Sequence, residues 1–132
     1  MFPPGTDVVI GVELDDQGRI PMHTYGAEGV HQMLAGDCDL DTAAWAAERI
    51  RPQGMALMTE PFPAGGWPAG VRSAFVACSE DPIQPAEATQ ASAAERGVEA
   101  VILPGSHSPF LSRPKDLAAT LDGLLSDPGR WG

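Results

Sequence analysis

Two apolar segments in the second half of the chain have the pattern of strands from a parallel sheet. Residues 71–78 alternate and then run apolar, and residues 98–103 are β-branched and almost continuously apolar. Between them, residues 85–96 have a helical composition and are followed by Gly97, which suits the position just after a helix. We therefore predict a parallel strand, helix, strand unit, because the connection is long enough for a crossover.

A final helix is predicted to begin at Pro114, because proline is tolerated in the first turn of a helix. Its apolar stripe follows helical spacing: Leu117, Leu121, Leu124 and Leu125. Apolar parallel strands need cover on both faces, so we expect this helix to supply one layer. Two strands alone do not make a stable sheet. The pattern therefore predicts further neighbours, from the same gene product or from a second chain, which includes a homodimer.

The preceding part of the chain is irregular, since prolines and glycines interrupt it repeatedly. One helix is predicted there, over residues 42–51, with Asp41 as its N-cap and Pro52 at its end. We accordingly divide the chain into a lid-like segment, residues 1–70, and a core portion, residues 71–132. The predicted fold class is α/β, as one incomplete domain overall.

Composition is that of a globular protein: 132 residues, 43% hydrophobic, with a mean hydropathy of −0.09. No apolar run approaches the roughly 18 residues of a membrane span. The first residues lack a basic segment followed by an apolar one, so a cytoplasmic location is expected. Eight basic against 18 acidic residues give a net charge of −10, which disfavours nucleic acid and anionic membranes as partners.

Metal and cofactor signals are weak. Four acidic side chains have the spacing of a calcium-binding loop: Asp37, Asp39, Asp41 and Glu48. That loop needs glycine where this chain has Thr42, so we interpret the acids as charges favouring a helix N-terminus. His23 and His31 have no ligand at zinc-site spacing and are predicted to be solvated loop residues. We expect no metal and, without a glycine-rich phosphate-binding motif, no nucleotide cofactor.

The two cysteines, Cys38 and Cys78, are too few for a disulfide framework, so both are expected to be free thiols. Cys78 lies at the end of a predicted strand and is expected to be a core residue.

The chemistry-bearing residues are Asp81 and His107, each on a loop just after a predicted strand. In open parallel sheets, reactive groups lie beyond the carboxyl ends of the strands. Asp81 would accept a hydrogen bond from Nδ1 of His107, leaving Nε2 free to deprotonate a nucleophile. The alternative is that Asp81 and Pro82 only form a turn and that His107 is a solvated loop residue, with no catalytic role for either. No Gly-x-Ser-x-Gly nucleophile motif occurs in the sequence.

The stretches FVACSEDPIQP, ILPGSHSPFLSRP and LAATLDGLL resemble the C-terminal part of the α/β-hydrolase fold, in its compact esterase and hydroxynitrile-lyase-like branch. The Asp81 to Pro85 turn matches the branch's acid turn, and Gly105, His107 and Pro109 match its histidine turn. Upstream, FPPGTDVV, DDQGRIPMH and DTAAWAAERIRPQGMALMTEP resemble more loosely the lid of that family. The resemblance implies a three-layer sheet, of which this chain holds the last strands and the lid.

The resemblance also implies hydrolysis of a small carboxylic ester or related acyl compound, without a cofactor. His107 would be the general base and Asp81 the orienting acid, with the serine encoded upstream of Met1. Lid residues would line an apolar pocket or simply pack within the lid: Trp45, Met55, Leu57, Met58, Phe62 and Trp67. The alternative is a non-catalytic module that dimerises or binds a partner through its exposed strand edges.

Overall fold

The computed structural model describes residues 14–60 and 70–126, except for the side chains of Leu57 and Met58. Two of the predicted pocket residues, Phe62 and Trp67, therefore lie outside the described residues. None of the helices formed by the described residues has the length and apolarity that crossing a bilayer requires.

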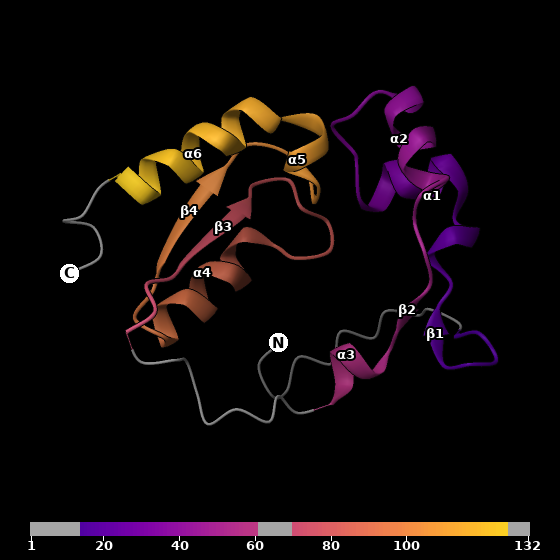
Figure 1. Ribbon diagram of the computed structural model, residues 1–132, viewed down its shortest axis with the longest axis horizontal. Helices are drawn as coiled ribbons and strands as arrows, with labels where there is room; N and C mark the ends of the chain where they lie inside the picture. The colour runs from indigo at the N-terminus through magenta and orange to yellow at the C-terminus, as the bar shows by residue number, and fades with distance from the viewer. Residues whose placement is uncertain (1–13, 61–69, 127–132) are drawn as a thin grey trace.

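A parallel strand pair with a helical crossover forms the sheet that carries the candidate site (Figure 1). Strand β3 (Ala74–Cys78) pairs in parallel with β4 (Glu99–Leu103), so that each of the five residues of β3 faces its counterpart in β4. Helix α4 (Ala86–Glu95) connects them and packs against both strands. The predicted α/β class and parallel pairing are confirmed, with β3 starting three residues later than predicted.

Helix α4 forms where the sequence is rich in alanine, the best helix former. It presents Thr89 and Ala93, one turn apart, as buried residues, which allows the backbone to approach the strands closely. Gly97, just after the helix, has a φ of +63°, a left-handed conformation that glycine adopts without strain. This is the predicted helix-ending role of Gly97.

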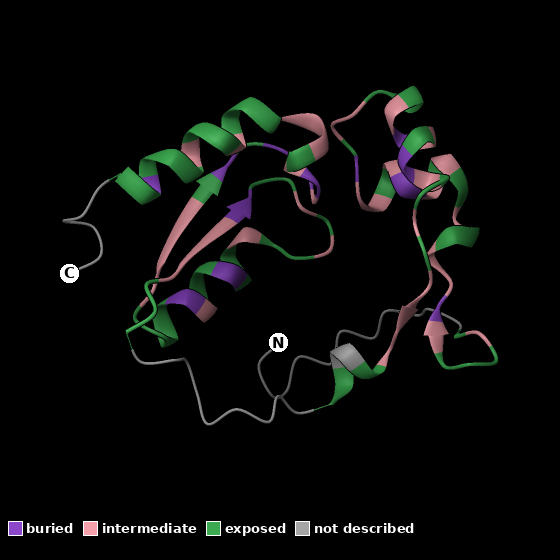
Figure 2. Cartoon of the chain, viewed as in Figure 1, coloured by how far each residue is buried: buried purple, intermediate pink, exposed green. Residues whose placement is uncertain are grey.

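On the opposite side of the strand pair lies α6 (Pro114–Ser126), preceded by the short helix α5 (Pro109–Ser112) (Figure 1). The predicted start at Pro114 is confirmed. The predicted leucine stripe is only partly buried, since Leu124 is 4% exposed but Leu125 is 74% exposed. Most of α6 is green, and so exposed, in Figure 2. The described residues therefore leave part of this apolar stripe uncovered.

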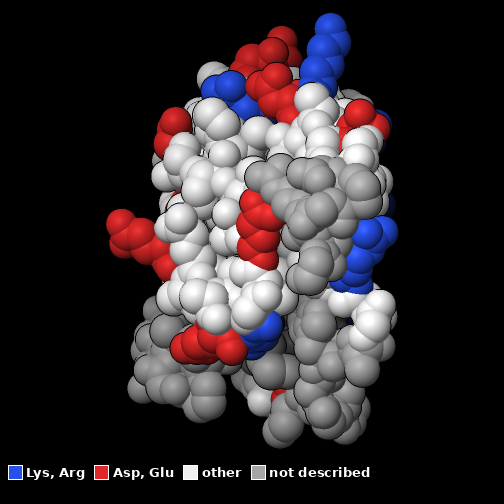
Figure 3. All heavy atoms as spheres, turned by 90° about the vertical axis from the view of Figure 1, so that its left-hand side faces the viewer, with Lys and Arg blue, Asp and Glu red and all other residues white. Residues whose placement is uncertain are grey.

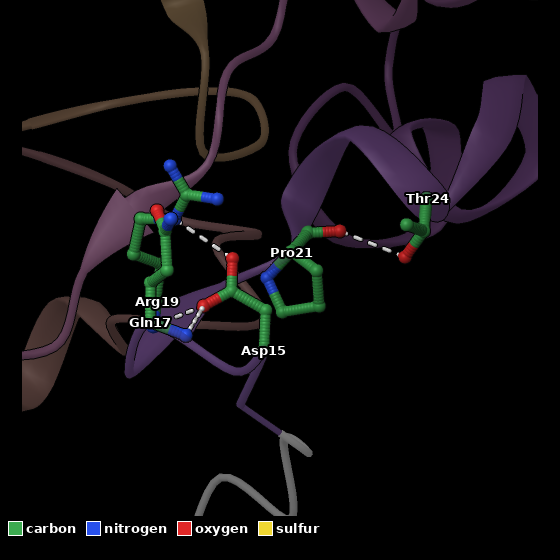
Figure 4. A network of polar contacts seen from close by, with 5 residues as sticks. All are labelled: Asp15, Gln17, Arg19, Pro21 and Thr24. Carbon is green, nitrogen blue, oxygen red and sulfur yellow. Dashed lines mark hydrogen bonds and ion pairs between the residues drawn. The ribbon is translucent and has the colours of Figure 1, made fainter.

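The start of the described chain forms a small antiparallel pair, β1 (Arg19–Ile20) with β2 (Gln53–Gly54). The turn before β1 is organised by Asp15, as Figure 4 shows. Its Oδ1 accepts hydrogen bonds from the backbone N–H groups of Gln17 and Arg19 at 2.9 and 2.8 Å, and its Oδ2 accepts one from Nε of Arg19 at 2.7 Å. One aspartate therefore fixes both the turn and the first residue of the strand.

Two short helices, α1 (Gly26–Met33) and α2 (Leu40–Ala47), pack against each other and form a second small core. Its buried members are Val30, Ala35 and Ala46, and Leu111 of α5 packs against them from the sheet side. The prediction of a single helix in residues 1–70 is wrong, because α1 forms in the glycine-containing sequence before α2, and a single-turn helix α3 (Ala56–Thr59) follows. Tertiary packing of Val30 compensates for the poor helix propensity of the glycines.

Helix α2 begins two residues earlier than predicted and ends at Ala47, before the predicted end at Pro52. The N-cap is Asp39 and not Asp41, because the side chain of Asp39 accepts the N–H of Thr42 at 2.7 Å. That bond lowers the pKa of the Asp39 carboxyl group. Asp39 therefore caps α2, in agreement with the interpretation that these acids favour a helix N-terminus.

His31 also differs from its prediction, since it lies within α1 and is half-buried rather than in a solvated loop. Its Nε2 lies 3.1 Å from the carbonyl oxygen of Cys38 and ties α1 to the loop that leads into α2. His23 is exposed and belongs to a single turn of 3₁₀ helix, η1 (Met22–Thr24).

The surface charge is distributed without a continuous basic area on the face shown in Figure 3. Lys and Arg side chains on that face stand apart from one another, and acidic side chains lie beside several of them and near the centre of the view. The net charge of −10 for the chain opposes the attraction of polyanions.

Candidate active site

The two loops that follow β3 and β4 continue to pair after the strands end. The N–H of Ser79 donates to the carbonyl of Leu103, and the N–H of Glu80 donates to the carbonyl of Gly105, both at 2.9 Å. These bonds extend the register of the sheet into the loops. Asp81 and His107, each a residue or two further on, are consequently brought to the same edge.

Asp81 uses its two carboxylate oxygens differently. Oδ1 accepts the backbone N–H groups of Ile83 and Gln84, both at 2.9 Å, and so closes the turn that leads into α4. Oδ2 is left to face His107. The side chain of Asp81 is only 9% exposed. The two hydrogen bonds of its own turn hold it in place independently of its contact with His107.

His107 and Asp81 form the predicted pair, 26 residues apart in sequence, with Nδ1 of the ring 2.8 Å from Oδ2. A carboxylate only accepts hydrogen bonds, so Nδ1 carries the proton and Nε2 is the basic nitrogen of the neutral ring. The imidazole is 33% exposed. The geometry is that of an oriented general base whose reactive nitrogen is turned away from its carboxylate.

Gly105 makes the sharp turn that presents the histidine. Its φ is +121°, a conformation that side-chain-bearing residues rarely adopt. A Cβ at this position would lie 2.5 Å from Oδ2 of Asp37 and 3.0 Å from Nε of Arg113. Both the backbone conformation and the neighbouring side chains therefore require glycine at this position of the histidine turn.

The predicted pocket residues that the structure describes lie on or next to α2 and α3. Trp45 lies on α2, is 51% exposed, and has its ring stacked against the guanidinium of Arg49, 4.2 Å from the ring centroid. Met55 is half-buried at the start of α3. Met58 lies in α3, but its side chain is not described. Their roles in a substrate pocket stay predictions.

A cleft of about 500 Å³ lies beside α5 and α6 and has a mixed polar and apolar lining. Its walls include none of the predicted pocket residues: they are Asp37, Ser112, Arg113, Pro114, Lys115 and Asp116. His107 is not part of this lining either. The cleft is therefore a feature separate from the expected acyl pocket, which stays a prediction.

The thiols are poor candidates for the nucleophile that would complete the pair. Burial, followed by the charges of Asp81 and Asp37, raises the pKa of Cys78. Burial and the carboxylates on either side of it, Asp37 and Asp39, raise the pKa of Cys38. Both are free cysteines, as predicted, and both remain protonated at neutral pH, whereas a nucleophilic thiol needs a lowered pKa. Cys78 is 6% exposed, in agreement with its predicted place in the core.

In the part of the chain that the structure describes, no group of three or more His, Cys, Asp or Glu side chains is arranged so that it could hold a metal ion. Asp37, which the calcium pattern would use first, instead accepts a hydrogen bond from Nε of Arg113 at 3.3 Å.

That contact is one the sequence did not indicate. It joins residues 76 positions apart, and a second contact, from the N–H of Gly36 to Oγ of Ser106 at 3.3 Å, joins residues 70 apart. No periodic pattern or known spacing links such pairs. The requirement for glycine at Gly105 was the one available sign that something packs closely against this loop.

Comparison with known proteins places these residues in context. A family model described as the alpha/beta hydrolase family matches residues 3–120, which include both Asp81 and His107. No curated protein gives a significant match to the chain.

Proposed function

Since the chain belongs to the alpha/beta hydrolase family, we propose that Asp81 and His107 are the orienting acid and general base of a hydrolase acting on small carboxylic esters. The observation that carries the proposal is the bond of 2.8 Å between Nδ1 of His107 and Oδ2 of Asp81, at the carboxyl ends of two parallel strands. The chain contains no Gly-x-Ser-x-Gly, so the serine is proposed to come from sequence outside these 132 residues.

In the proposed reaction, Nε2 of His107 takes the proton of the serine hydroxyl as its oxygen attacks the ester carbonyl. Asp81 stabilises the imidazolium that forms and keeps its ring oriented. The imidazolium then protonates the departing alcohol, leaving an acyl-enzyme. Water, deprotonated by the same nitrogen, attacks the acyl group and releases the acid, returning serine and histidine to their starting states. Backbone N–H groups would hold the oxyanion in each half-reaction.

The substitution His107→Ala tests this proposal in the native gene product that contains these residues. We expect turnover of short-chain aryl esters to fall by about 10³-fold or more, because removal of the base leaves only binding and oxyanion stabilisation. Initial rates with a chromogenic acetate ester give the measurement. The control is His23→Ala, since His23 is exposed on η1. An unchanged rate in His107→Ala would falsify the assignment.

A second candidate, a non-catalytic module that pairs with another copy of this chain, is supported by the exposure of large apolar residues on the sheet side. These are Val71, Ile102, Leu121 and Leu125, with exposures from 39% to 74%. Scattered exposed apolar residues are common, but these adjoin a strand pair that has no further strand among the described residues. Sedimentation equilibrium distinguishes the candidates: a stable dimer without ester turnover favours the module, and an active monomer excludes it.

A further inference from the structure

The loop that carries His107 is held from two sides. On one side the Asp81 turn contacts it, through the bond between Glu80 and Gly105 and through the histidine ring itself. On the other side lies the loop between α1 and α2, which comes from a part of the chain that has no role in the proposed reaction. Here Gly36 donates its N–H to the hydroxyl of Ser106, whose side chain is almost wholly buried at 3% exposure.

Asp37 is the centre of this second contact. Its side chain is 13% exposed, and Oδ2 both accepts a bond from Nε of Arg113 and packs against the backbone of Gly105. Its Oδ1 is buried and meets no donor in full hydrogen-bond geometry among the described residues, although the hydroxyl of Ser112 and the N–H of Ser106 lie near the carboxylate. A carboxylate in this position places a negative charge two residues from the proposed base, on the opposite side of the loop from Asp81.

The surroundings of Asp37 favour its charged form. Burial alone would raise the pKa of its carboxyl group, but the hydroxyl of Ser112, the N–H of Ser106 and the side chain of Arg113 outweigh that effect, so the net pKa is lowered. Arg113 is partly exposed and also lies 3.7 Å from the carboxylate of Asp116, an exposed residue on α6. The Asp37 to Arg113 pair therefore exists as an ion pair at neutral pH.

Among the described residues, Gly36, Asp37 and Arg113 contact this loop at Gly105 and Ser106, so the position of the ring depends on how these residues pack there. An ion pair that fills the space beside a glycine prevents the loop from relaxing in that direction. Small displacements of a general base have large effects, since a shift of about 1 Å costs roughly 10²-fold in rate.

We propose that Asp37 is a positioning residue, which with Arg113 holds the loop of residues 104–108 so that the ring of His107 stays on Asp81. This inference rests on the proposed function for its effect on rate. Its structural content, the orientation of the ring, does not. The proposal gives the helical pair α1 and α2 a role in addition to the predicted lid. Asp37, which positions the general base, lies in the loop between these two helices.

The kinetic test is Asp37→Ala in the native gene product. We expect kcat for an aryl ester to fall by about 10- to 100-fold with KM nearly unchanged, because the substitution moves the base and not the substrate contacts. Asp37→Asn keeps the size and one acceptor oxygen, so it should recover part of the loss. The matched control is Asp116→Asn, which removes the other carboxylate near Arg113 without touching the loop; its kcat should equal that of the wild type.

The second readout needs no turnover. In the native gene product, ¹⁵N resonances of His107 should report a ring protonated at Nδ1 in the wild type and a mixture of the two tautomers in Asp37→Ala. A wild-type tautomer together with a wild-type kcat in Asp37→Ala would overturn the inference. If circular dichroism shows that the alanine variant does not fold, Asp37→Asn decides: a mixed tautomer supports the inference and a wild-type ring overturns it.

The two proposals fail in different ways. If His107→Ala retains full turnover, the proposed function is wrong, whatever Asp37 does to the ring. If His107→Ala abolishes turnover while Asp37→Ala leaves both kcat and the tautomer unchanged, the proposed function stands and the positioning role of Asp37 is wrong.

Discussion

At the scale of single residues, the candidate site contains two carboxylates, and in each of them the two oxygens make different contacts. Asp81 uses one oxygen for its own turn and one for His107, and Asp37 directs one oxygen at Arg113 while the other stays buried. Both carboxylates border the same five-residue loop. A loop held between these two acids keeps its conformation only while each acid retains its partner. Substituting His107 or Arg113 therefore tests the loop as directly as substituting Asp81 or Asp37.

Gly105 provides the clearest test at this scale. Gly105→Ala should destabilise the chain by about 1–3 kcal/mol for the backbone conformation alone, and by more because the new Cβ meets Asp37. The matched variant is Gly97→Ala, which also has a positive φ but has open space around it. Urea unfolding of both variants gives the two free energies. Equal losses would show that the contact with Asp37 has no energetic importance.

At the scale of elements, the two halves of the described chain have separate cores. Helices α1 and α2 enclose Val30, and β3, β4 and α4 enclose Ala77 and Ala93. Leu111 of α5 connects the two, together with the contacts of Gly36 and Asp37. The helical pair therefore depends on its own packing for stability and on a few side chains for its attachment to the sheet.

Val30→Ala should destabilise the helical pair by about 2 kcal/mol, because Val30 is 1% exposed and its loss leaves a cavity between α1 and α2. Leu40→Ala, in the same pair but at a site 63% exposed, should change stability by less than about 0.5 kcal/mol. Denaturant unfolding followed by far-UV circular dichroism compares them. A neutral Val30→Ala would mean that this small core does not hold the helices together.

Sequence reasoning predicted the elements whose signals are local and left out those that depend on distant packing. The strand pair was predicted from apolar runs, and the end of α4 from Gly97. Helix α1 was not predicted, since two glycines lower its propensity and burial of Val30 supplies the stabilisation. The N-cap was placed at Asp41 because several acids there fit the role, and only the hydrogen bond to Thr42 distinguishes Asp39.

In the candidate site, too, the contacts within one local unit were predicted and those that depend on distant packing were not. Asp81 and His107 were predicted because each follows a strand of one local unit. The contact of Asp37 with Arg113 was not predicted, because its formation depends on how the helical pair docks onto the sheet and no spacing rule covers that. The division of the chain near residue 70 and the pocket roles of Trp45 and Met55 stay predictions.

At the scale of the whole molecule, stability should depend on the charge of Asp37. Its pKa in the folded chain lies below the usual 3.8, so its contribution is fully present above that value and is lost as the pH falls through the folded-state pKa. Asp37→Asn should lower the melting temperature at pH 7 and make it less sensitive to acid, so that the two melting temperatures approach each other as the pH falls below 3.8. Thermal scans from pH 7 to pH 3 would show this. Parallel curves would contradict it.

The sequence separations of these contacts also set an order for folding. Asp81 and His107 are 26 residues apart, whereas Asp37 and Arg113 are 76 apart, and the longer loop costs about 1 kcal/mol more entropy to close. The strand, helix, strand unit can therefore form first and bring acid and base together while the helical pair is still undocked. Docking then comes last in folding, and the reverse step, undocking, is the first opening expected in hydrogen exchange.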